Sequence, residues 1–291
     1  LSSSYAGADL ANYNITSQAS TTANITAKSL TITGITASNK VYDGTVNATI
    51  NTSAVNSTTM VGMGLIAGDD LSLAVTGTFA DKNANTSKVV TLNSSYSGND
   101  VGNYNITSQA NTTANITAKA LTITGLTADN KVYDGTVNAT INISAVNSTS
   151  LVGMGLIAGD NVSLSAAGTF ADKNVNTSKV VTINSIFRGA DAGNYNITSQ
   201  ANTTADITAK ALTITGITAT DKVYDGNRTA VIDTTGVNST SMVGMGLIAG
   251  DVVTLSATGT FADKNVNTSK VVTLSSSYAG ADLANYNITS Q

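Results

Sequence analysis

The chain has 291 residues and a net charge of −4 at pH 7, and it contains no Cys, Pro, His or Trp. Every acidic residue is Asp. Without imidazole or thiol groups, the Ser-His and Cys-His pairs of nucleophilic catalysis and the usual zinc ligands are excluded. We therefore predict no catalytic, cofactor-binding or metal-binding residue and do not expect an enzyme. The basic residues are scattered singly, which argues against nucleic-acid binding, and no apolar run is long enough for a membrane span.

A period of 91 residues organises the sequence. The string NYNITSQ begins at four positions, Asn12, Asn103, Asn194 and Asn285. The strings KVYDG and FADKN each recur three times in the same register. Residues 1–18 are identical to residues 274–291, so we expect three distinct units to form one period of a longer array, with any export signal or anchor outside it.

This period predicts four segments. They are the closing strands of a preceding repeat at residues 1–27, β domains at residues 28–118 and 119–209, and a third β domain at residues 210–291 that lacks its closing strand.

The first predicted elements of the middle unit are a strand and a hairpin. Residues 121–126 alternate apolar residues with Thr, which is typical of a half-buried strand. Asp134 and Gly135 then stand between two β-prone arms, and both tolerate the positive φ of a two-residue turn. We expect a hairpin over residues 131–137.

The remaining elements are a second hairpin and two closing strands. Residues 162–166 alternate, residues 172–178 are turn formers, and residues 180–183 are β-prone, which predicts strand, turn and strand. Residues 195–198 and 205–209 predict the closing strands. Residues 152–160 are mostly apolar and are interrupted by three glycines, so we expect them to form a loop over the edge of the core.

These elements favour an all-β fold. Six or seven short strands in one period predict a tandem array of small Ig-like β-sandwich domains, with β-grasp-like or small barrel modules as alternatives. Residues 206–214 run β-prone from one unit into the next without a Gly/Ser linker. We therefore expect domains stacked end to end in a stiff, extended rod.

The combination of KVYDG, the Gly-Asp pairs, GTFADKN and NYNIT resembles the YDG repeat. That repeat belongs to the mostly-β, glycine-rich (MBG) domains of large bacterial surface proteins. The resemblance implies a tandem array in an extracellular or cell-surface adhesin, a filamentous haemagglutinin-like protein or a fibre. One departure is Ile-Thr-Ala-Lys at the joints, for example at Ile25 and Ala27, where the family often has Ile-Thr-Pro-Lys. Ala restores a backbone N–H, so the joint strand can pair with a neighbour.

The sequence contains candidates for three further kinds of site. Asp70, Asp81, Asp100 and their equivalents are candidates for a Ca²⁺ site, although no calcium motif is present. Lys173 and Asn174 with a nearby Asp are candidates for an isopeptide cross-link, which an intact mass would reveal. Asn-x-Ser/Thr sequons are abundant and are candidates for glycosylation, for example at Asn14, Asn24, Asn105, Asn147, Asn196, Asn238 and Asn287.

The leading hypothesis is a structural stalk or filament-forming segment. Its expected partners are neighbouring repeats and laterally associated or end-to-end copies of the same protein, in one covalent chain or joined by strand exchange. The alternative is a multivalent module whose repeated loops contact carbohydrate or a cell-surface receptor. A hydrolase using Asp pairs is disfavoured because no cleft motif places such a pair.

Overall fold

The computed structural model describes residues 1–290. The chain divides into two compact units, Leu1–Ala118 and Lys119–Gln291. The first unit holds the N-terminal segment (residues 1–27) and repeat 1 (residues 28–118). The second holds repeat 2 (residues 119–209) and repeat 3 (residues 210–291). The predicted all-β fold is confirmed in part: the described residues form three tandem repeats that are mostly β, and each repeat also contains one short α-helix. Within the part of the chain that the structure describes, no helix is both long and apolar enough to span a bilayer.

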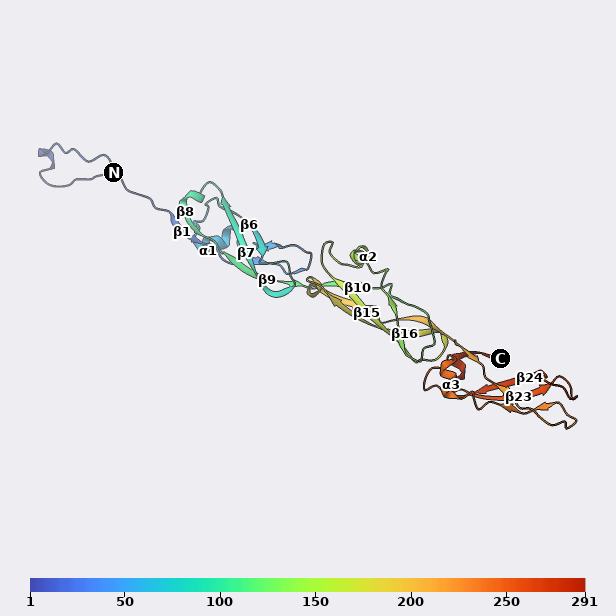
Figure 1. Ribbon diagram of the computed structural model, residues 1–291. Helices are drawn as coiled ribbons and strands as arrows, with labels where there is room; N and C mark the ends of the chain where they lie inside the picture. The colour runs from blue at the N-terminus through green and yellow to red at the C-terminus, as the bar shows by residue number, and fades with distance from the viewer. Residues whose placement is uncertain (291) are drawn as a thin grey trace. The chain divides into compact units, whose positions relative to one another are not determined.

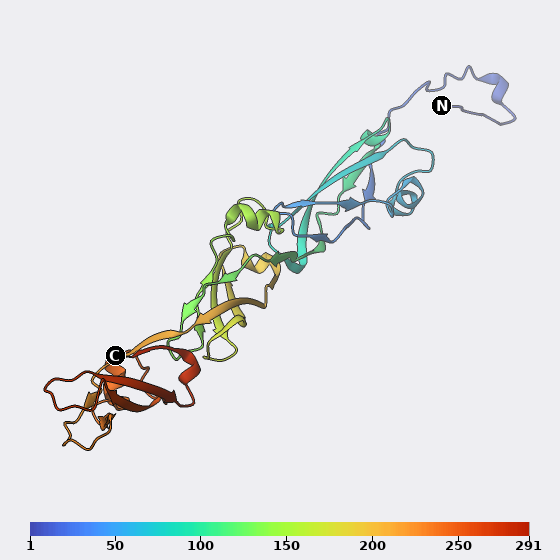
Figure 2. The ribbon, with the colours of Figure 1, turned by 90° about the vertical axis from the view of Figure 1, so that its right-hand side faces the viewer.

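The first unit begins with a 3-10 turn, η1 (Leu10–Asn12), followed by the elements of repeat 1. They are β1 (Lys28–Thr31), β2 (Thr36–Ala37), β3 (Lys40–Val41), β4 (Asn47–Ala48), β5 (Ile50–Asn51), α1 (Ser57–Met63), β6 (Ser72–Phe79), β7 (Asn85–Ser97), η2 (Val101–Asn103), β8 (Tyr104–Thr107) and β9 (Asn111–Thr117). The β6–β7 hairpin runs along this repeat, and α1 lies beside β1 (Figures 1 and 2).

Repeat 2 has the same elements in the same order. They are β10 (Lys119–Ile123), β11 (Thr127–Ala128), β12 (Lys131–Val132), β13 (Asn138–Ala139), β14 (Ile141–Asn142), α2 (Ser148–Gly153), β15 (Ser163–Phe170), β16 (Asn176–Arg188), η3 (Ala192–Asn194), β17 (Tyr195–Ser199) and β18 (Asn202–Thr208).

Repeat 3 carries fewer strands. They are β19 (Lys210–Ile214), β20 (Thr218–Ala219), β21 (Thr229–Ala230), β22 (Ile232–Asp233), β23 (Thr254–Phe261), β24 (Val272–Ala279) and β25 (Tyr286–Ser290), with α3 (Ser239–Gly244) and η4 (Leu283–Asn285).

The main sheet of repeat 2 is five-stranded, in the order β12-β18-β16-β15-β13, and the main sheet of repeat 1 has the equivalent order β3-β9-β7-β6-β4. The edge strands β12 and β13 are joined only by residues 133–137. Such a short connection can join opposite edges only if the sheet curls until they approach each other. The sheets are therefore barrel-like and are not clearly Ig-like sandwiches, so the small barrel, weighed as an alternative, describes them better.

The predicted hairpin over residues 131–137 is wrong. Strand β12 pairs in parallel with β18, and β13 pairs with β15. The turn chemistry itself is present, because Gly135 has φ 76° and the Asp134 carboxylate accepts the Thr136 amide at 2.9 Å. The turn therefore bridges two sheet edges instead of joining two paired strands.

A lysine holds this bridge together. The ammonium of Lys131 donates to Asp134 Oδ1 at 2.7 Å and to the Thr136 carbonyl at 2.8 Å, and it lies 5.5 Å from the centroid of the Phe170 ring. Lys40 and Lys222 make the same kinds of contact in their repeats. The Lys and Asp of KVYDG therefore fasten the bridge between the two edges, and the aromatic ring beneath adds a cation–π contact.

The second hairpin is confirmed as β15 and β16, which pair from Ser163–Arg188 to Phe170–Val181. The predicted first and closing strands are also present, as β10, β17 and β18. Gly168 of β15 has a steric role, since a Cβ there would lie 2.5 Å from Ile141 Cδ1. Only glycine admits the Ile141 side chain this close to the sheet.

The predicted loop over residues 152–160 is partly helical. Helix α2 begins after Asn147, whose side chain accepts the Ser150 amide at 3.0 Å, while the Ser150 hydroxyl accepts the Asn147 amide at 2.9 Å. This reciprocal capping box satisfies two amides at the helix start. The loop that follows brings Leu156 into the core. Residues 152–160 therefore lie at the edge of the core, as the end of a helix followed by a turn.

Candidate functional site

A buried polar site lies between repeats 2 and 3, which belong to one compact unit. Repeat 2 contributes two loops. Tyr133 stands in the loop that bridges β12 and β13, and Lys173 stands in the turn of the β15–β16 hairpin. The Lys173 ammonium lies 5.8 Å from the centroid of the Tyr133 ring. The YDG and FADKN strings therefore meet at one end of the repeat.

Repeat 3 presents a carboxylate to these loops. Asp251 follows α3, and its Oδ2 accepts the hydroxyl of Tyr286, the first residue of β25, at 2.7 Å. The Tyr286 oxygen in turn accepts the Ile248 amide at 2.8 Å. The equivalent Tyr and Asp pair within the other repeats, as Tyr104 with Asp69 and Tyr195 with Asp160. Each repeat therefore fixes its own Gly-Asp carboxylate with the Tyr of NYNIT.

Tyr133 and Lys173 complete the coordination of Asp251. The Tyr133 hydroxyl donates to Asp251 Oδ2 at 2.7 Å, and the Lys173 ammonium donates to Asp251 Oδ1 at 2.8 Å. Lys173 also lies 3.3 Å from Asp282 Oδ1. Asp251 is only 6% exposed. Both oxygens of this buried carboxylate are therefore hydrogen-bonded, as a buried charge requires.

The electrostatics of the site follow from these contacts. Burial alone would raise the pKa of Asp251, but the hydrogen bonds from Lys173, Tyr286 and Tyr133 outweigh it and hold the pKa below its usual value. The hydrogen bonds to Asp251 and to Tyr133 raise the pKa of Lys173. Burial and the hydrogen bond to Asp251 raise the pKa of Tyr286 and of Tyr133. Near neutral pH the site is therefore a charged Lys–Asp pair flanked by two neutral phenols.

A second set of contacts surrounds the carboxylate. Asn285 Oδ1 accepts the Val175 amide at 2.9 Å, and Asn285 Nδ2 donates to Asn174 Oδ1 at 3.2 Å. The Tyr133 and Tyr286 rings meet edge to face, with centroids 5.6 Å apart. The aromatic pair and the two amide contacts add complementary packing to the ion pair.

The hydrophobic core continues through this joint. One cluster of buried side chains includes Phe170 and Ile207 of repeat 2 together with Leu212 and Met242 of repeat 3. Strands β18 and β19 are separated only by Ala209, so the prediction that β-prone backbone runs from unit to unit without a linker is confirmed at this joint. The two repeats are joined by backbone, by apolar packing and by a buried ion pair.

Comparison with repeat 3 shows what the joint contributes. Tyr133 is 1% exposed, whereas Tyr224, which occupies the same position one period later, is 56% exposed. Lys264, the counterpart of Lys173, has no ion pair among the described residues. These two residues are therefore natural controls for the joint.

The candidate calcium residues are not all together. Asp70 and Asp100 lie close, since the Asp70 amide donates to Asp100 Oδ2 at 2.9 Å. Asp81 instead forms an ion pair with Lys88 at 2.6 Å. Among the described residues, no group of three or more acidic side chains that could hold a metal ion is found. The positions equivalent to Asp70 are Asn161 and Val252, which weakens the case for a repeated calcium site.

The remaining candidates are placed as follows. Lys173 pairs with Asp251 and Asp282, while Asn174 contacts Asn285, so both isopeptide candidates belong to the joint between the repeats. The seven sequon asparagines named as examples are all exposed. Sequence reasoning named Lys173 for a different chemistry and treated the Tyr of KVYDG as part of a turn. The sequence feature that could have indicated the joint is that the Tyr of KVYDG, the Lys of FADKN and the Asp of the Gly-Asp pair all recur with the same period of 91 residues.

A family model described as the YDG domain matches the chain three times, at residues 26–113, 117–204 and 208–291. No curated protein and no solved structure matches the chain significantly.

Proposed function

Since the chain belongs to the YDG domain family and carries that domain three times in tandem, we propose that it is a structural stalk or filament-forming segment of a large extracellular bacterial surface protein. Its role would be to hold other parts of that protein at a distance from the cell, for adhesion or for attachment between cells or to surfaces. No chemistry on a substrate is part of this proposal.

The joint between repeats 2 and 3 is the observation that carries the proposal. Flexible tethers between domains are rich in Gly and Ser and leave few contacts across the boundary. Here a single residue, Ala209, separates two strands, and the buried carboxylate of Asp251 is bound by side chains from both repeats. A joint of this kind resists bending and twisting, which is what a stalk needs and a freely jointed chain of binding modules does not.

The alternative function, multivalent binding of carbohydrate or a cell-surface receptor, needs repeated loops that are free to meet a ligand. In repeat 2 the YDG loop and the FADKN turn are occupied by the joint. This favours the structural role over direct binding by these loops.

The location and the partners are also part of the proposal. An extracellular or cell-surface location, in an adhesin or a filamentous haemagglutinin-like protein, is supported by the resemblance of the repeats to those of bacterial surface proteins. Immunogold labelling of intact producing cells with an antibody against the chain tests it. Label confined to the cell interior would refute the stalk.

Stiffness is tested by distance measurements across the joint. The chain has no Cys, so spin labels can be attached at Ser165→Cys and Ser256→Cys, two exposed positions one period apart. Double electron–electron resonance on the full chain should give one narrow distance distribution. The combined Tyr133→Phe and Lys173→Met substitutions should broaden it, and Lys264→Met should not. A broad distribution in the unmodified joint would contradict the proposal.

A further inference from the structure

The first and last stretches of repeat 2 are paired from one end of the repeat to the other. The chain enters through residues 119–133, the entry segment, which contains β10 and β12, and it leaves through residues 195–208, the exit segment, which contains β17 and β18. Strand β10 pairs in parallel with β17, and β12 pairs in parallel with β18. Paired residues are 76 positions apart in both ladders. The two segments therefore keep one register throughout.

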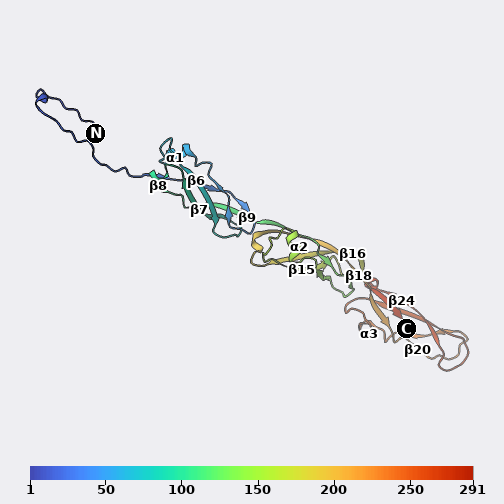
Figure 3. The same cartoon turned by 90° about the horizontal axis from the view of Figure 1, so that it is seen from above.

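Further hydrogen bonds join the segments beyond these two ladders. The Asp206 amide donates to Asn130 Oδ1 at 2.7 Å, and the Tyr133 amide donates to the Thr208 carbonyl at 2.8 Å. On its other side, β18 lies alongside β16 and pairs with it in antiparallel fashion (Figure 3). The β18 part of the exit segment is therefore bonded along both of its edges.

The glutamine of NYNITSQ fills the gap between the two ladders. Gln200 follows β17, and its backbone amide donates to the Ile123 carbonyl at 3.0 Å. Its side-chain Oε1 accepts the Leu126 amide at 3.1 Å, and its Nε2 donates to the Leu126 carbonyl at 2.7 Å. The carboxamide therefore satisfies both backbone groups of one residue, as a neighbouring strand would. Gln109 binds Ile35 in the same way in repeat 1, at 3.0 and 2.8 Å.

Tension along the chain loads these bonds in shear. It acts on the start of the entry segment and on the end of the exit segment, because the chain enters and leaves the repeat there. Since the segments are parallel, the two pulls drive them past each other along their common length. The bonds between them then share the load and must fail together, whereas a ladder pulled apart from one end opens one pair at a time. Shared loading slows the unfolding step, and the rate of that step governs forced unfolding.

We propose that the entry and exit segments form a shear clamp, closed by Gln200, that carries tension through repeat 2. Repeat 1 has the equivalent clamp, because β1 pairs in parallel with β8 and β3 pairs in parallel with β9. Strands β19 and β25 of repeat 3 pair in the same way. Residues 134–194 lie outside the clamp, so their loops and turns bear little of the load.

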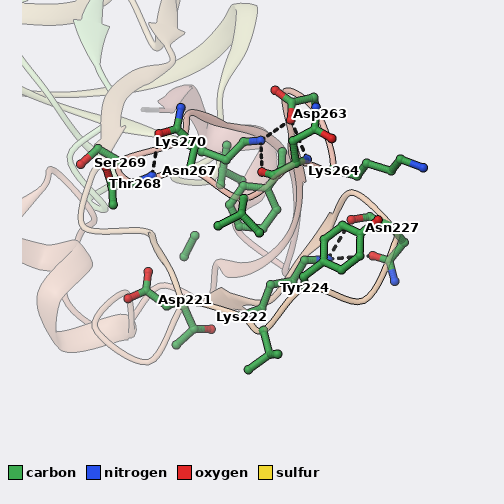
Figure 4. Close-up of a pocket in the computed structure, with 17 residues that line it drawn as sticks. Asp221, Lys222, Tyr224, Asn227, Asp263, Lys264, Asn267, Thr268, Ser269 and Lys270 are labelled. Atoms are coloured by element: carbon green, nitrogen blue, oxygen red, sulfur yellow. Dashed lines mark hydrogen bonds and ion pairs between the residues drawn. The ribbon is translucent and has the colours of Figure 1, made fainter.

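Burial and the YDG bridge protect the clamp. Leu121 of the entry segment and Ile207 of the exit segment are 0% and 1% exposed, so water has little access to the bonds between the segments, and hydrogen bonds are stronger in such surroundings. The bridge fastened by Lys131 directly follows the entry segment and keeps its end from fraying. Figure 4 shows the equivalent lysine of repeat 3, Lys222, bonded to Asn227.

This inference rests on the proposed function, because a stalk under tension is what needs such a clamp. The two fail separately. The stalk is tested by the location of the protein and by the stiffness of the joint between repeats 2 and 3, whereas the clamp lies within one repeat. A repeat that opens easily under load could still sit in a stiff joint on the cell surface.

The first experiment pulls repeat 2 in two directions within the full chain. The chain has no Cys, so handles for optical tweezers can be attached at introduced cysteines under reducing conditions. Ala120→Cys with Ala209→Cys loads the segments in shear, whereas Ala120→Cys with Asn196→Cys pulls two directly opposed residues apart. All three positions are exposed, so folding is preserved. The shear pair should unfold the repeat at a several-fold higher force. Equal forces, or a higher force for the opposed pair, would overturn the proposal.

The second experiment tests the glutamine. Gln200→Met keeps the length of the side chain and removes its carboxamide, so it should lower the unfolding force of the shear pair. The force of the opposed pair should not change, because peeling begins at the other end of the β10–β17 ladder. Gln109→Met, the same substitution in repeat 1, should alter neither force. Equal lowering of both forces by Gln200→Met would show only a general loss of stability. That result, or an unchanged shear force, would contradict the clamp.

Discussion

Replacing Tyr133 by Phe should loosen the joint between repeats 2 and 3 without disturbing its shape. The substitution keeps the ring that meets Tyr286 edge to face and removes the hydroxyl that donates to Asp251 at 2.7 Å. A hydrogen bond to a charged group contributes about 1.5 to 3 kcal/mol. Tyr286 still donates to the same oxygen, so the carboxylate keeps a partner there. We therefore expect a loss in the lower half of that range, about 1.5 to 2 kcal/mol.

Hydrogen exchange of one amide reports this loss. The Val175 amide of repeat 2 donates across the joint to Asn285 Oδ1 at 2.9 Å, so its exchange requires the joint to open. A loss of about 1.5 to 2 kcal/mol corresponds to about 10- to 30-fold faster exchange. The Phe170 amide, which bonds Val137 within repeat 2 at 2.8 Å, should keep its rate.

Tyr224→Phe is the matched control for this substitution. It removes the same hydroxyl from the same motif in repeat 3, where the side chain is largely exposed. It should leave the Val175 rate unchanged. Two results would refute the reasoning. One is an unchanged Val175 rate in Tyr133→Phe, and the other is an equal acceleration of the Phe170 amide, which would show that repeat 2 itself had been destabilised.

Three further predictions concern pH, the bridge between sheet edges and the core. Because the pKa of Asp251 is lowered in the folded chain, the stability it adds is present above the ordinary Asp value and is lost as the pH falls below about 4; the distance distribution across the joint should broaden there and recover on neutralisation. Lys131→Met should cost repeat 2 about 1 to 3 kcal/mol in thermal unfolding, whereas Lys264→Met should be nearly neutral. Gly168→Ala should cost about 1 to 3 kcal/mol through overpacking, and adding Ile141→Val, which removes the clashing Cδ1, should restore part of it in a double-mutant cycle.

The local elements of the fold could be predicted from the sequence, and the closure of the sheet could not. Alternation predicted β10, β15 and β17, because strands bury alternate residues whatever their partners, and β-prone runs predicted β16 and β18. The turn formers between β15 and β16 predicted that hairpin. Strand β12, however, pairs with β18, and Lys131 lies opposite Ile207. No local pattern specifies a partner so far along the chain, so the YDG turn was interpreted as the nearest possible hairpin.

Helix α2 was missed for a different reason. Its helical residues include Ser, Thr, Val and Gly, which are poor helix formers. The one local signal was the capping box of Asn147 and Ser150, which lies just before residues 152–160, the stretch interpreted as a loop. A short helix of this composition is held by its caps and by packing of Leu151 in the core.

The candidate site shows the same limit more strongly. Tyr133 and Asp251 are 118 positions apart, and neither belongs to a motif that signals a binding pair. The repeat supplied indirect information, since the Tyr, the Lys and the Asp each recur at a fixed position in every period of 91 residues. Whether the loops that carry Tyr133 and Lys173 reach Asp251 depends on how the sheet of repeat 2 curls, and the curl is a property of the whole fold that local sequence does not specify.

Besides the apolar packing that continues through the joint, two attachments at different points connect the repeats, and the distance between these points decides the stiffness of the joint. One is covalent, because β18 becomes β19 through Ala209 while both strands are hydrogen-bonded in their own sheets. The other is lateral, because Tyr133 and Lys173 bind Asp251 from loops that are distant in sequence from β18. A single attachment leaves rotation about the connecting backbone, whereas a second one at a different point removes it. The lateral attachment includes the ion pair between Lys173 and the buried carboxylate of Asp251. Opening the attachment therefore separates this ion pair and exposes apolar core residues in the same step. Loss of the lateral contacts should therefore convert this joint into a hinge while each repeat stays folded.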